Sequence, residues 1–258
     1  MTVTIAVAGK GGTGKTTFTA LTIRYLLDTG RKPILAVDGD PSSNLHSALG
    51  LPLYQTVGQI REETRDQVTT GTFQTGISKP QWFELQVNEC LVESENVDLL
   101  AMGRAEGPGC YCAANNMLRD CVDRLASDYP YVVIDNEAGM EHISRQTTRD
   151  VDHLFIVSDP SRRGLEAAQR IVELVADLGN RINKSYLVIN NVVGELPGSF
   201  ITAIEALDVT FLGTLPHDSQ VSELDLVGEP LVQLAEVQDE DGEAHIYPRL
   251  EALLAKVL

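Results

Sequence analysis

A glycine-rich stretch near the amino terminus has the residue types and spacing of a phosphate-binding loop. Residues 9–17 read GKGGTGKTT and fit the pattern G-x-x-x-x-G-K-[ST]. In such a loop, backbone N–H groups surround the phosphates, the lysine reaches the β- and γ-phosphates, and the hydroxyl that follows it binds Mg²⁺. The lysine here is Lys15, and the hydroxyl belongs to Thr16. The predicted nucleotide contacts are Gly11, Gly12, Thr13, Gly14, Lys15, Thr16 and Thr17.

Two cysteines, Cys110 and Cys112, offer a second kind of chemistry because a single residue separates them. This spacing brings two thiolates within reach of one metal ion, but it supplies only half of a tetrahedral four-sulfur set. A disulfide between residues so close in the chain would be strained. The spacing alone leaves three interpretations open: a metal site, a reactive thiol pair, or two buried loop cysteines. Cys90 and Cys121 fall on apolar helical stripes and are expected in the core.

The elements that must position these residues alternate between strand and helix along the chain. Helical patterns lie at residues 15–28, 165–178 and 247–258. Apolar runs typical of buried strands lie at residues 3–8, 34–37, 97–102, 131–134, 154–157, 186–189 and 211–215. This alternation predicts an α/β fold, with a single doubly wound, mostly parallel sheet and helices on both faces. The phosphate loop then lies between the first strand and the first helix, which is the context that its pattern requires.

The chain has 258 residues, which is enough for one such domain with a full hydrophobic core. No change in composition marks a linker, so we expect a single domain over residues 1–258. Residues 51–93 depart from the alternation because they are polar and rich in turn-forming residues. They are predicted to form an insertion of helices and loops.

The charge balance argues against several kinds of partner. The chain has 20 Lys and Arg against 37 Asp and Glu, which gives a net charge of −17. Such an acidic excess repels phosphate backbones and anionic lipid head groups, so we expect no nucleic-acid partner and no stable membrane insertion. No apolar run approaches the roughly 18 residues that span a bilayer, and the amino terminus lacks the charge order of a secretory signal. We therefore expect a cytoplasmic protein in a reducing compartment.

The phosphate loop carries a second lysine, Lys10, and so resembles the deviant Walker A loop GKGGxGKT of the ParA/MinD-like P-loop ATPases. The resemblance implies a SIMIBI-type P-loop NTPase fold and a homodimer that encloses ATP. In that arrangement Lys10 reaches the nucleotide of the opposite subunit and stabilises charge on the transferring phosphoryl group. The catalytic residues implied by the resemblance are Lys10, Lys15, Asp40 and Asp135.

Other motifs of that family follow in order along the chain. The sequence DGDP at residues 38–41 resembles its switch I, which implies that Asp40 positions the attacking water and that Asp38 helps to hold Mg²⁺. Asp135 ends an apolar run as a Walker B residue does, which implies a contact with Mg²⁺ through water. Gly139 follows as the switch II residue whose amide senses the γ-phosphate. The resemblance also implies an adenine-binding edge formed by Asn190, Pro216, His217 and Asp218.

The segments around the cysteine pair resemble a narrower group within this superfamily. Residues 103–112 and 135–145 together look like the CooC-type accessory ATPases of carbon monoxide dehydrogenase, which are associated with nickel insertion. The resemblance implies that Cys110 and Cys112 bind Ni²⁺ or Zn²⁺ between subunits, so that a second copy of the chain completes the four sulfur ligands. It further implies ATP or ADP with Mg²⁺ as cofactors and carbon monoxide dehydrogenase as the client.

Two other functions stay open at this point. One is an iron–sulfur cluster carrier, because related dimeric ATPases hold a [4Fe–4S] cluster with cysteines from both subunits, although commonly through C-x-x-C. The other is a ParA/MinD-like positioning switch on a membrane or DNA, because the last helix has apolar residues along one side. Only two basic residues, Arg249 and Lys256, lie within that helix, which favours a helix packed on the core.

Overall fold

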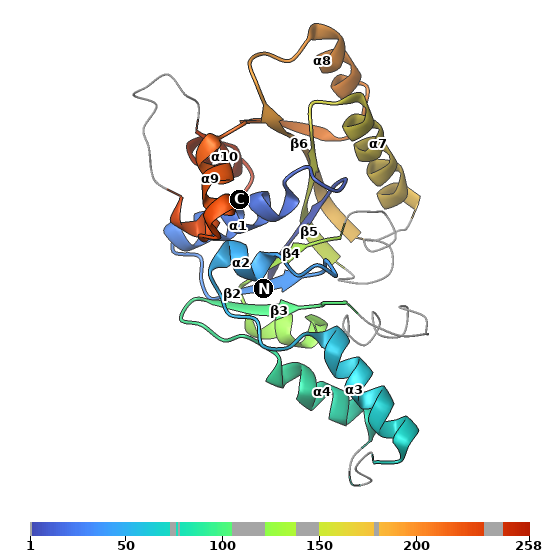
Figure 1. Ribbon diagram of the computed structural model, residues 1–258. Coiled ribbons are helices and arrows are strands. Elements are labelled where there is room, and N and C mark those ends of the chain that lie inside the picture. Colours follow the sequence, from blue (N-terminus) through green and yellow to red (C-terminus); the bar gives the residue numbers. More distant parts are fainter. Residues whose placement is uncertain are drawn as a thin grey trace.

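The chain folds around a seven-stranded parallel sheet in a computed structural model that describes residues 2–72, 76, 78–104, 122–137, 150–177, 181–234 and 245–258 (Figure 1). The strand order is β3-β2-β4-β1-β5-β6-β7, and each pair of neighbours is parallel. The predicted fold class is therefore confirmed. The strands are β1 (Val3–Ala8), β2 (Ile34–Asp38), β3 (Val97–Ala101), β4 (Tyr131–Asp135), β5 (Asp150–Ser158), β6 (Arg181–Val192) and β7 (Thr210–Pro216).

Helices cover both faces of the sheet, because successive strand residues point to opposite faces and are apolar on both. On one face, Ile5 and Val7 of β1 belong to a core cluster that includes residues of α1, α2 and α10. On the other face, Ala6 and Ala8 belong to a cluster that includes α7, α8 and the start of α3. The helices are α1 (Lys15–Asp28), α2 (Leu45–Leu49), α3 (Val57–Thr70), α4 (Lys79–Glu89), α7 (Arg162–Asp177), α8 (Gly198–Glu205), α9 (Ser219–Val227) and α10 (Ile246–Leu254), with 3₁₀ turns η1 (Ala126–Asp128) and η2 (Leu231–Gln233).

Each apolar run that was predicted as a strand lies within a strand, apart from one end residue, and two strands are longer than predicted. β5 and β6 extend well beyond residues 154–157 and 186–189. Their outer parts include polar residues, such as Asp152 and Asn183, which an apolar criterion does not detect. The Asn183 amide donates a hydrogen bond to the Asp152 carboxylate at 3.0 Å, so these residues join the two strands. Helix α1 has the predicted bounds, whereas α7 begins earlier than predicted, at Arg162.

The last helix, α10, packs on the core. It begins at Ile246 and ends at Leu254, short of the predicted end at residue 258. Leu250, Leu253 and Leu254 are buried, and the helix contacts both β7 and α1. Within the described ranges, no helix is long and apolar enough to cross a membrane.

The segment predicted as an insertion contains α3 and α4, which extend away from the sheet beyond β3 (Figure 1). The two helices pack on each other. Val57, Ile60 and Cys90 anchor the base of this pair in the second core cluster, so the expected core position of Cys90 is confirmed.

Backbone hydrogen bonds at the end of β3 tie α3 to the sheet. The Met102 N–H donates to the Asp38 carbonyl at 2.8 Å, and the Met102 carbonyl accepts from the Gly58 N–H at 2.8 Å. Thr56, which caps α3, lies against Gly103, and a Cβ at residue 103 would overlap the Thr56 side chain. Gly103 also has a φ of 63°, a conformation that favours glycine. Glycine at this position therefore lets α3 approach the sheet closely.

We predict that Gly103→Ala lowers the free energy of unfolding by about 1–3 kcal/mol, because alanine must adopt a left-handed backbone and displace Thr56. Gly71→Ala is the matched control, since Gly71 has a similar φ of 72° but a methyl group there would meet nothing within 4 Å. Chemical denaturation of both variants measures the difference. Equal losses would contradict a role for the contact with Thr56.

Candidate functional site

The predicted phosphate loop connects β1 to α1 and is closed by its own hydrogen bonds. The Lys10 carbonyl accepts from the Thr13 hydroxyl at 2.9 Å and from the Lys15 ammonium at 3.5 Å. Gly14 is the N-cap of α1 with a φ of 86°, and it has no side chain that could cap the helix. The loop therefore brings the N–H groups of the first turn of α1 close to the buried Lys15 side chain. Both favour a bound phosphate.

Strands β5 and β6 hold this loop from outside. The side-chain amide of Asn190, on β6, donates to the Thr13 carbonyl at 2.9 Å. A Cβ on Gly14 would overlap the same amide, and a Cβ on Gly9 would overlap the carbonyl of Val157 on β5. The glycines thus permit a close approach that larger residues would prevent.

Asp38 and Asp135 lie side by side at the carboxyl ends of β2 and β4. They are register partners in the sheet, with exposures of 0% and 1%. The Thr16 hydroxyl donates to Asp135 Oδ2 at 2.6 Å. The two carboxylate oxygens of Asp38 accept from the backbone N–H groups of Asp40 at 3.0 Å and Leu45 at 2.8 Å. Asp38 therefore shapes the loop after β2, whereas Asp135 joins β4 to the phosphate loop.

Burial changes the protonation of both carboxyl groups. Desolvation raises the pKa of Asp135 to about 7 and the pKa of Asp38 to about 6. The hydrogen bond from Thr16 opposes the rise in the pKa of Asp135, and the negative charge of Asp38 adds to it. Because the two groups interact, they share their protons as a pair, and near neutral pH the pair retains part of a proton.

The oxygens around Asp135 fit a divalent cation. Asp135 Oδ1 is buried, and no residue that the structure describes donates a hydrogen bond to it. Carboxylate and hydroxyl oxygens are ligands that Mg²⁺ prefers, and Thr16 brings a hydroxyl to the same carboxylate. Asp38 lies next to this group, but both of its oxygens already bind backbone amides, so its contact with Mg²⁺ stays a prediction.

The other predicted catalytic residues lie on the rim of the site. Asp40 is partly buried and accepts a hydrogen bond from the Ser42 N–H at 2.8 Å. The Lys10 side chain is 43% exposed, and its ammonium lies 3.8 Å from the carboxylate of Asp159. No sequence pattern singles out Asp159, because its partner lies far away in the chain.

The predicted adenine-binding edge lies at a cavity of about 300 Å³ next to Gly14 and Thr17. Asn190 Oδ1 is buried and receives no hydrogen bond from the described part of the chain. Asp218 has a structural role, since its carboxylate accepts from the N–H groups of Gln220 at 3.0 Å and Ile246 at 2.9 Å. It therefore joins the first turns of α9 and α10. The residues predicted for the base lie in this cavity or next to it in the chain: Asn190, Pro216, His217 and Asp218.

The predicted cysteine site and the switch II amide fall outside the described residues. These residues are Cys110, Cys112 and Gly139, and Cys121 lies outside as well. Within the ranges that the structure describes, no three His, Cys, Asp or Glu side chains gather closely enough to hold a metal ion. The metal site at the cysteine pair stays a prediction.

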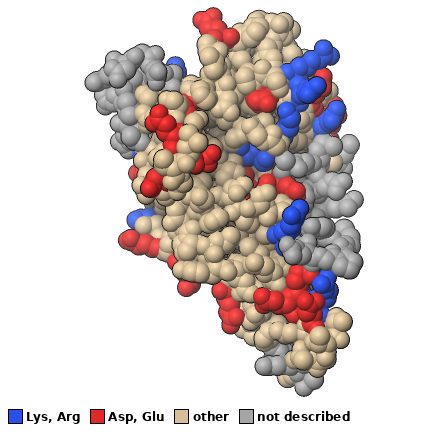
Figure 2. Space-filling model, in the orientation of Figure 1, with Lys and Arg blue, Asp and Glu red and all other residues tan. Residues whose placement is uncertain are grey.

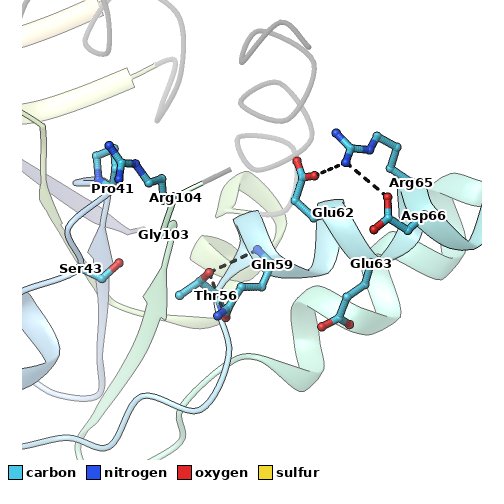
Figure 3. Close-up of a pocket in the computed structure, with 10 residues that line it drawn as sticks. All are labelled: Pro41, Ser43, Thr56, Gln59, Glu62, Glu63, Arg65, Asp66, Gly103 and Arg104. Atoms are coloured by element: carbon cyan, nitrogen blue, oxygen red, sulfur yellow. Dashed lines mark hydrogen bonds and ion pairs between the residues drawn. The ribbon is translucent and has the colours of Figure 1, made fainter. Parts of the chain in front are cut away.

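A second cavity of about 680 Å³ lies between the loop after β2 and α3, and no sequence pattern predicted it (Figure 3). Arg65 projects between two acidic residues of α3, at 2.7 Å from Glu62 and 3.3 Å from Asp66. Figure 2 shows a dense group of acidic side chains at this end of the molecule. Three segments line the cavity: Pro41, Ser43, Thr56, Gln59, Glu62, Glu63, Arg65, Asp66, Gly103 and Arg104.

A phosphate loop at the carboxyl edge of a parallel sheet, with acidic strand ends beside it, defines a P-loop nucleotide-binding protein. The sequence matches the CobQ/CobB/MinD/ParA nucleotide binding domain over residues 4–231, and the chain belongs to this family. The fold agrees with the septum site-determining protein MinD of Pyrococcus horikoshii, solved with Mg-ADP. That comparison has a TM-score of 0.66 and 22% identity, and it covers 100% of this chain and 97% of the other.

Two curated relatives extend over most of the chain. An uncharacterized ATP-binding protein of Methanocaldococcus jannaschii is 42% identical over 254 residues, which is 98% of both chains. The carbon monoxide dehydrogenase accessory protein CooC of Rhodospirillum rubrum is 35% identical over 236 residues, which is 87% of both chains. The chain is therefore a homologue of CooC.

We predict that Asp135→Asn changes how stability depends on pH in the protein free of nucleotide and Mg²⁺. The raised pKa of Asp135 means that the folded state binds a proton more tightly than the unfolded state. The stability contributed by the protonated Asp135 carboxyl group is therefore fully present below about pH 4 and is lost as pH rises through about 7. Asparagine cannot ionise, so the variant should gain about 1–4 kcal/mol relative to wild type between about pH 4 and pH 8. Denaturant unfolding across this range measures the gain, and parallel profiles would contradict the prediction.

Proposed function

We propose that this protein is a dimeric, ATP-dependent maturation ATPase that assists nickel insertion into carbon monoxide dehydrogenase. The observation that carries the proposal is the 35% identity to the carbon monoxide dehydrogenase accessory protein over 87% of both chains. The site geometry supports the nucleotide-dependent part, because Lys15, Thr16 and Asp135 meet at the start of α1. The nickel-dependent part depends on the pair Cys110 and Cys112.

In the proposed reaction, water attacks the γ-phosphorus of ATP, and the bond to the oxygen that bridges the β- and γ-phosphorus atoms breaks. Lys15 and the backbone N–H groups of the loop bind the phosphates, and Asp40 orients the water. Thr16 and Asp135 would hold Mg²⁺, and the bound ion would neutralise phosphate charge. We assign to the backbone amide of Gly139 the contact with the γ-phosphate.

Lys10 makes the reaction depend on a second copy of the chain. Its side chain lies on the exposed rim of the loop. We assign to it a contact with the phosphates of a facing protomer, whose charge it would stabilise. ATP therefore favours the closed dimer. Closure brings two pairs of Cys110 and Cys112 together, and their four thiolates bind one Ni²⁺ or Zn²⁺ as cargo. Hydrolysis opens the dimer and weakens this grip near the client.

The base contact proposed for Asn190 has a defined polarity. Its Nδ2 donates to the Thr13 carbonyl, and flipping the amide would set two oxygens against each other. Oδ1 therefore stays an acceptor, and it suits the amino group of adenine rather than the carbonyl oxygen of hypoxanthine or guanine.

We predict that the wild-type protein binds ATP about tenfold more tightly than ITP, because ITP places an oxygen opposite a buried acceptor. Asn190→Ala should bring the two dissociation constants close together. Asn191→Gly is the control, since Asn191 lines the same cavity at a φ of 59° that glycine adopts easily, and it should keep the preference. Titration calorimetry gives both constants. An unchanged preference in Asn190→Ala would contradict the assignment.

We predict that anaerobically purified protein binds about one nickel or zinc ion per two chains, and that ATP increases this occupancy together with the dimer fraction. Metal analysis alongside the mass in solution measures both. The double variant Cys110→Ala/Cys112→Ala should lose the metal, whereas Cys90→Ala, which removes a buried core thiol, should keep it.

Two results would contradict this function. A protein with iron and sulfide would instead be an iron–sulfur carrier. The second result is that neither ATP nor the double variant Cys110→Ala/Cys112→Ala changes the metal content or the dimer fraction. That result would contradict a nucleotide-gated metallochaperone.

A further inference from the structure

The ion pair between Lys10 and Asp159 joins the phosphate loop to a different part of the site. Lys10 lies in the loop after β1, and Asp159 directly follows β5. These strands are neighbours, with Ala8 and Ile156 in register, so their carboxyl ends meet at one edge of the sheet. The Lys10 ammonium lies 3.8 Å from the Asp159 carboxylate, and the two side chains are 43% and 29% exposed.

The Asp159 carboxylate is held in place from the side away from Lys10. The Ser161 hydroxyl donates to Asp159 Oδ1 and accepts from the Gly164 N–H at 3.0 Å, in the first turn of α7. A Cβ at residue 164 would overlap the same Oδ1 and lie 2.7 Å from the Ser158 hydroxyl. Asp159 therefore directs its other oxygen, Oδ2, toward Lys10. The amino end of α7 also favours a negative charge at this position.

Lys10 is fixed at its backbone as well. Its carbonyl accepts three hydrogen bonds, from the Thr13 N–H at 3.4 Å, the Thr13 hydroxyl at 2.9 Å and the Lys15 ammonium at 3.5 Å. An exposed ion pair is normally weak, in part because two mobile side chains must be ordered. Here the Asp159 carboxylate is already ordered by Ser161, which lowers that entropic penalty for one of the two partners.

We propose that Asp159 holds Lys10 against its own protomer, and that ATP-dependent pairing of two copies requires this ion pair to break. The inference rests on the proposed function, because only a lysine that acts on a facing protomer must leave its own chain. In this proposal the Lys10 ammonium exchanges the Asp159 carboxylate for a phosphate of the facing protomer when the dimer closes. Asp159 is thus a positioning residue that acts through Lys10, and Ser161, directly before α7, holds its carboxylate.

The test compares Asp159→Asn with wild type. Asparagine keeps an oxygen for the Ser161 hydroxyl but removes the charge that attracts Lys10. In nucleotide-free protein, an amine-reactive acetylating reagent should label Lys10 faster in the variant, while the exposed Lys32 serves as the reference in the same digest. With ATP, the variant should dimerise at a protein concentration about 2- to 5-fold lower than wild type. This gain should shrink as added salt screens the ion pair.

A second variant separates the charge from the helix cap. Ser161→Ala removes the hydroxyl that caps α7 and orients Asp159, but it keeps the Asp159 charge, so its salt-sensitive gain should be clearly smaller than that of Asp159→Asn. An equal gain in Ser161→Ala would overturn the proposal in favour of a loosened α7.

The labelling and the dimerisation fail separately. Unchanged labelling of Lys10 in Asp159→Asn would overturn the ion pair itself. Faster labelling of Lys10 with unchanged dimerisation would overturn the proposal that the ion pair opposes dimerisation. If neither protein forms an ATP-dependent dimer, the proposed function fails, and the proposed effect of the ion pair on dimerisation fails with it. The labelling still decides whether Asp159 holds Lys10.

Discussion

The burial of two adjacent carboxyl groups is the constraint on which the rest of the site depends. Parallel pairing of β2 with β4 sets Asp38 opposite Asp135, where water is excluded and each charge disfavours the other. The two buried carboxylates have different hydrogen-bond partners. Asp38 binds the amides of the following loop, and Asp135 binds Thr16 and keeps one oxygen without a donor among the described residues. A cation at Asp135 would relieve the destabilisation, so binding energy and folding energy are linked.

The same edge of the sheet carries three contacts that approach the phosphate loop from outside. Asn190 holds the Thr13 carbonyl from β6, the Val157 carbonyl approaches Gly9 from β5, and Asp159 holds the Lys10 side chain. On the opposite flank, the Asp38 carbonyl accepts a hydrogen bond from the Met102 N–H, and the Met102 carbonyl accepts one from Gly58 at the start of α3. Backbone hydrogen bonds therefore connect the end of β2 with the first turn of α3, and α3 borders the second cavity (Figure 3).

Local patterns predicted the strands and the phosphate loop because both depend on residues close in the chain. The apolar run at residues 3–8 and the glycines before Lys15 gave the bounds of β1 and α1 as they occur. The roles of Asp159 and Asp218 could not be predicted in this way. Asp159 acts on a lysine at the far end of the chain, and Asp218 caps its own helix and also α10. Their partners become neighbours only when the sheet order is known, and sequence periodicity does not reveal that order.

The buried carboxyl pair at the ends of β2 and β4 should hold a proton that Mg-nucleotide displaces. Calorimetric titration with ATP in excess Mg²⁺, repeated in buffers of different ionisation enthalpy, counts the protons released on binding. We predict release that approaches about one proton per chain near pH 6 and disappears above about pH 8, with most of it lost in Asp135→Asn. Binding without proton release near pH 6, or the same release in Asp135→Asn, would contradict this linkage between the carboxyl pair and the nucleotide.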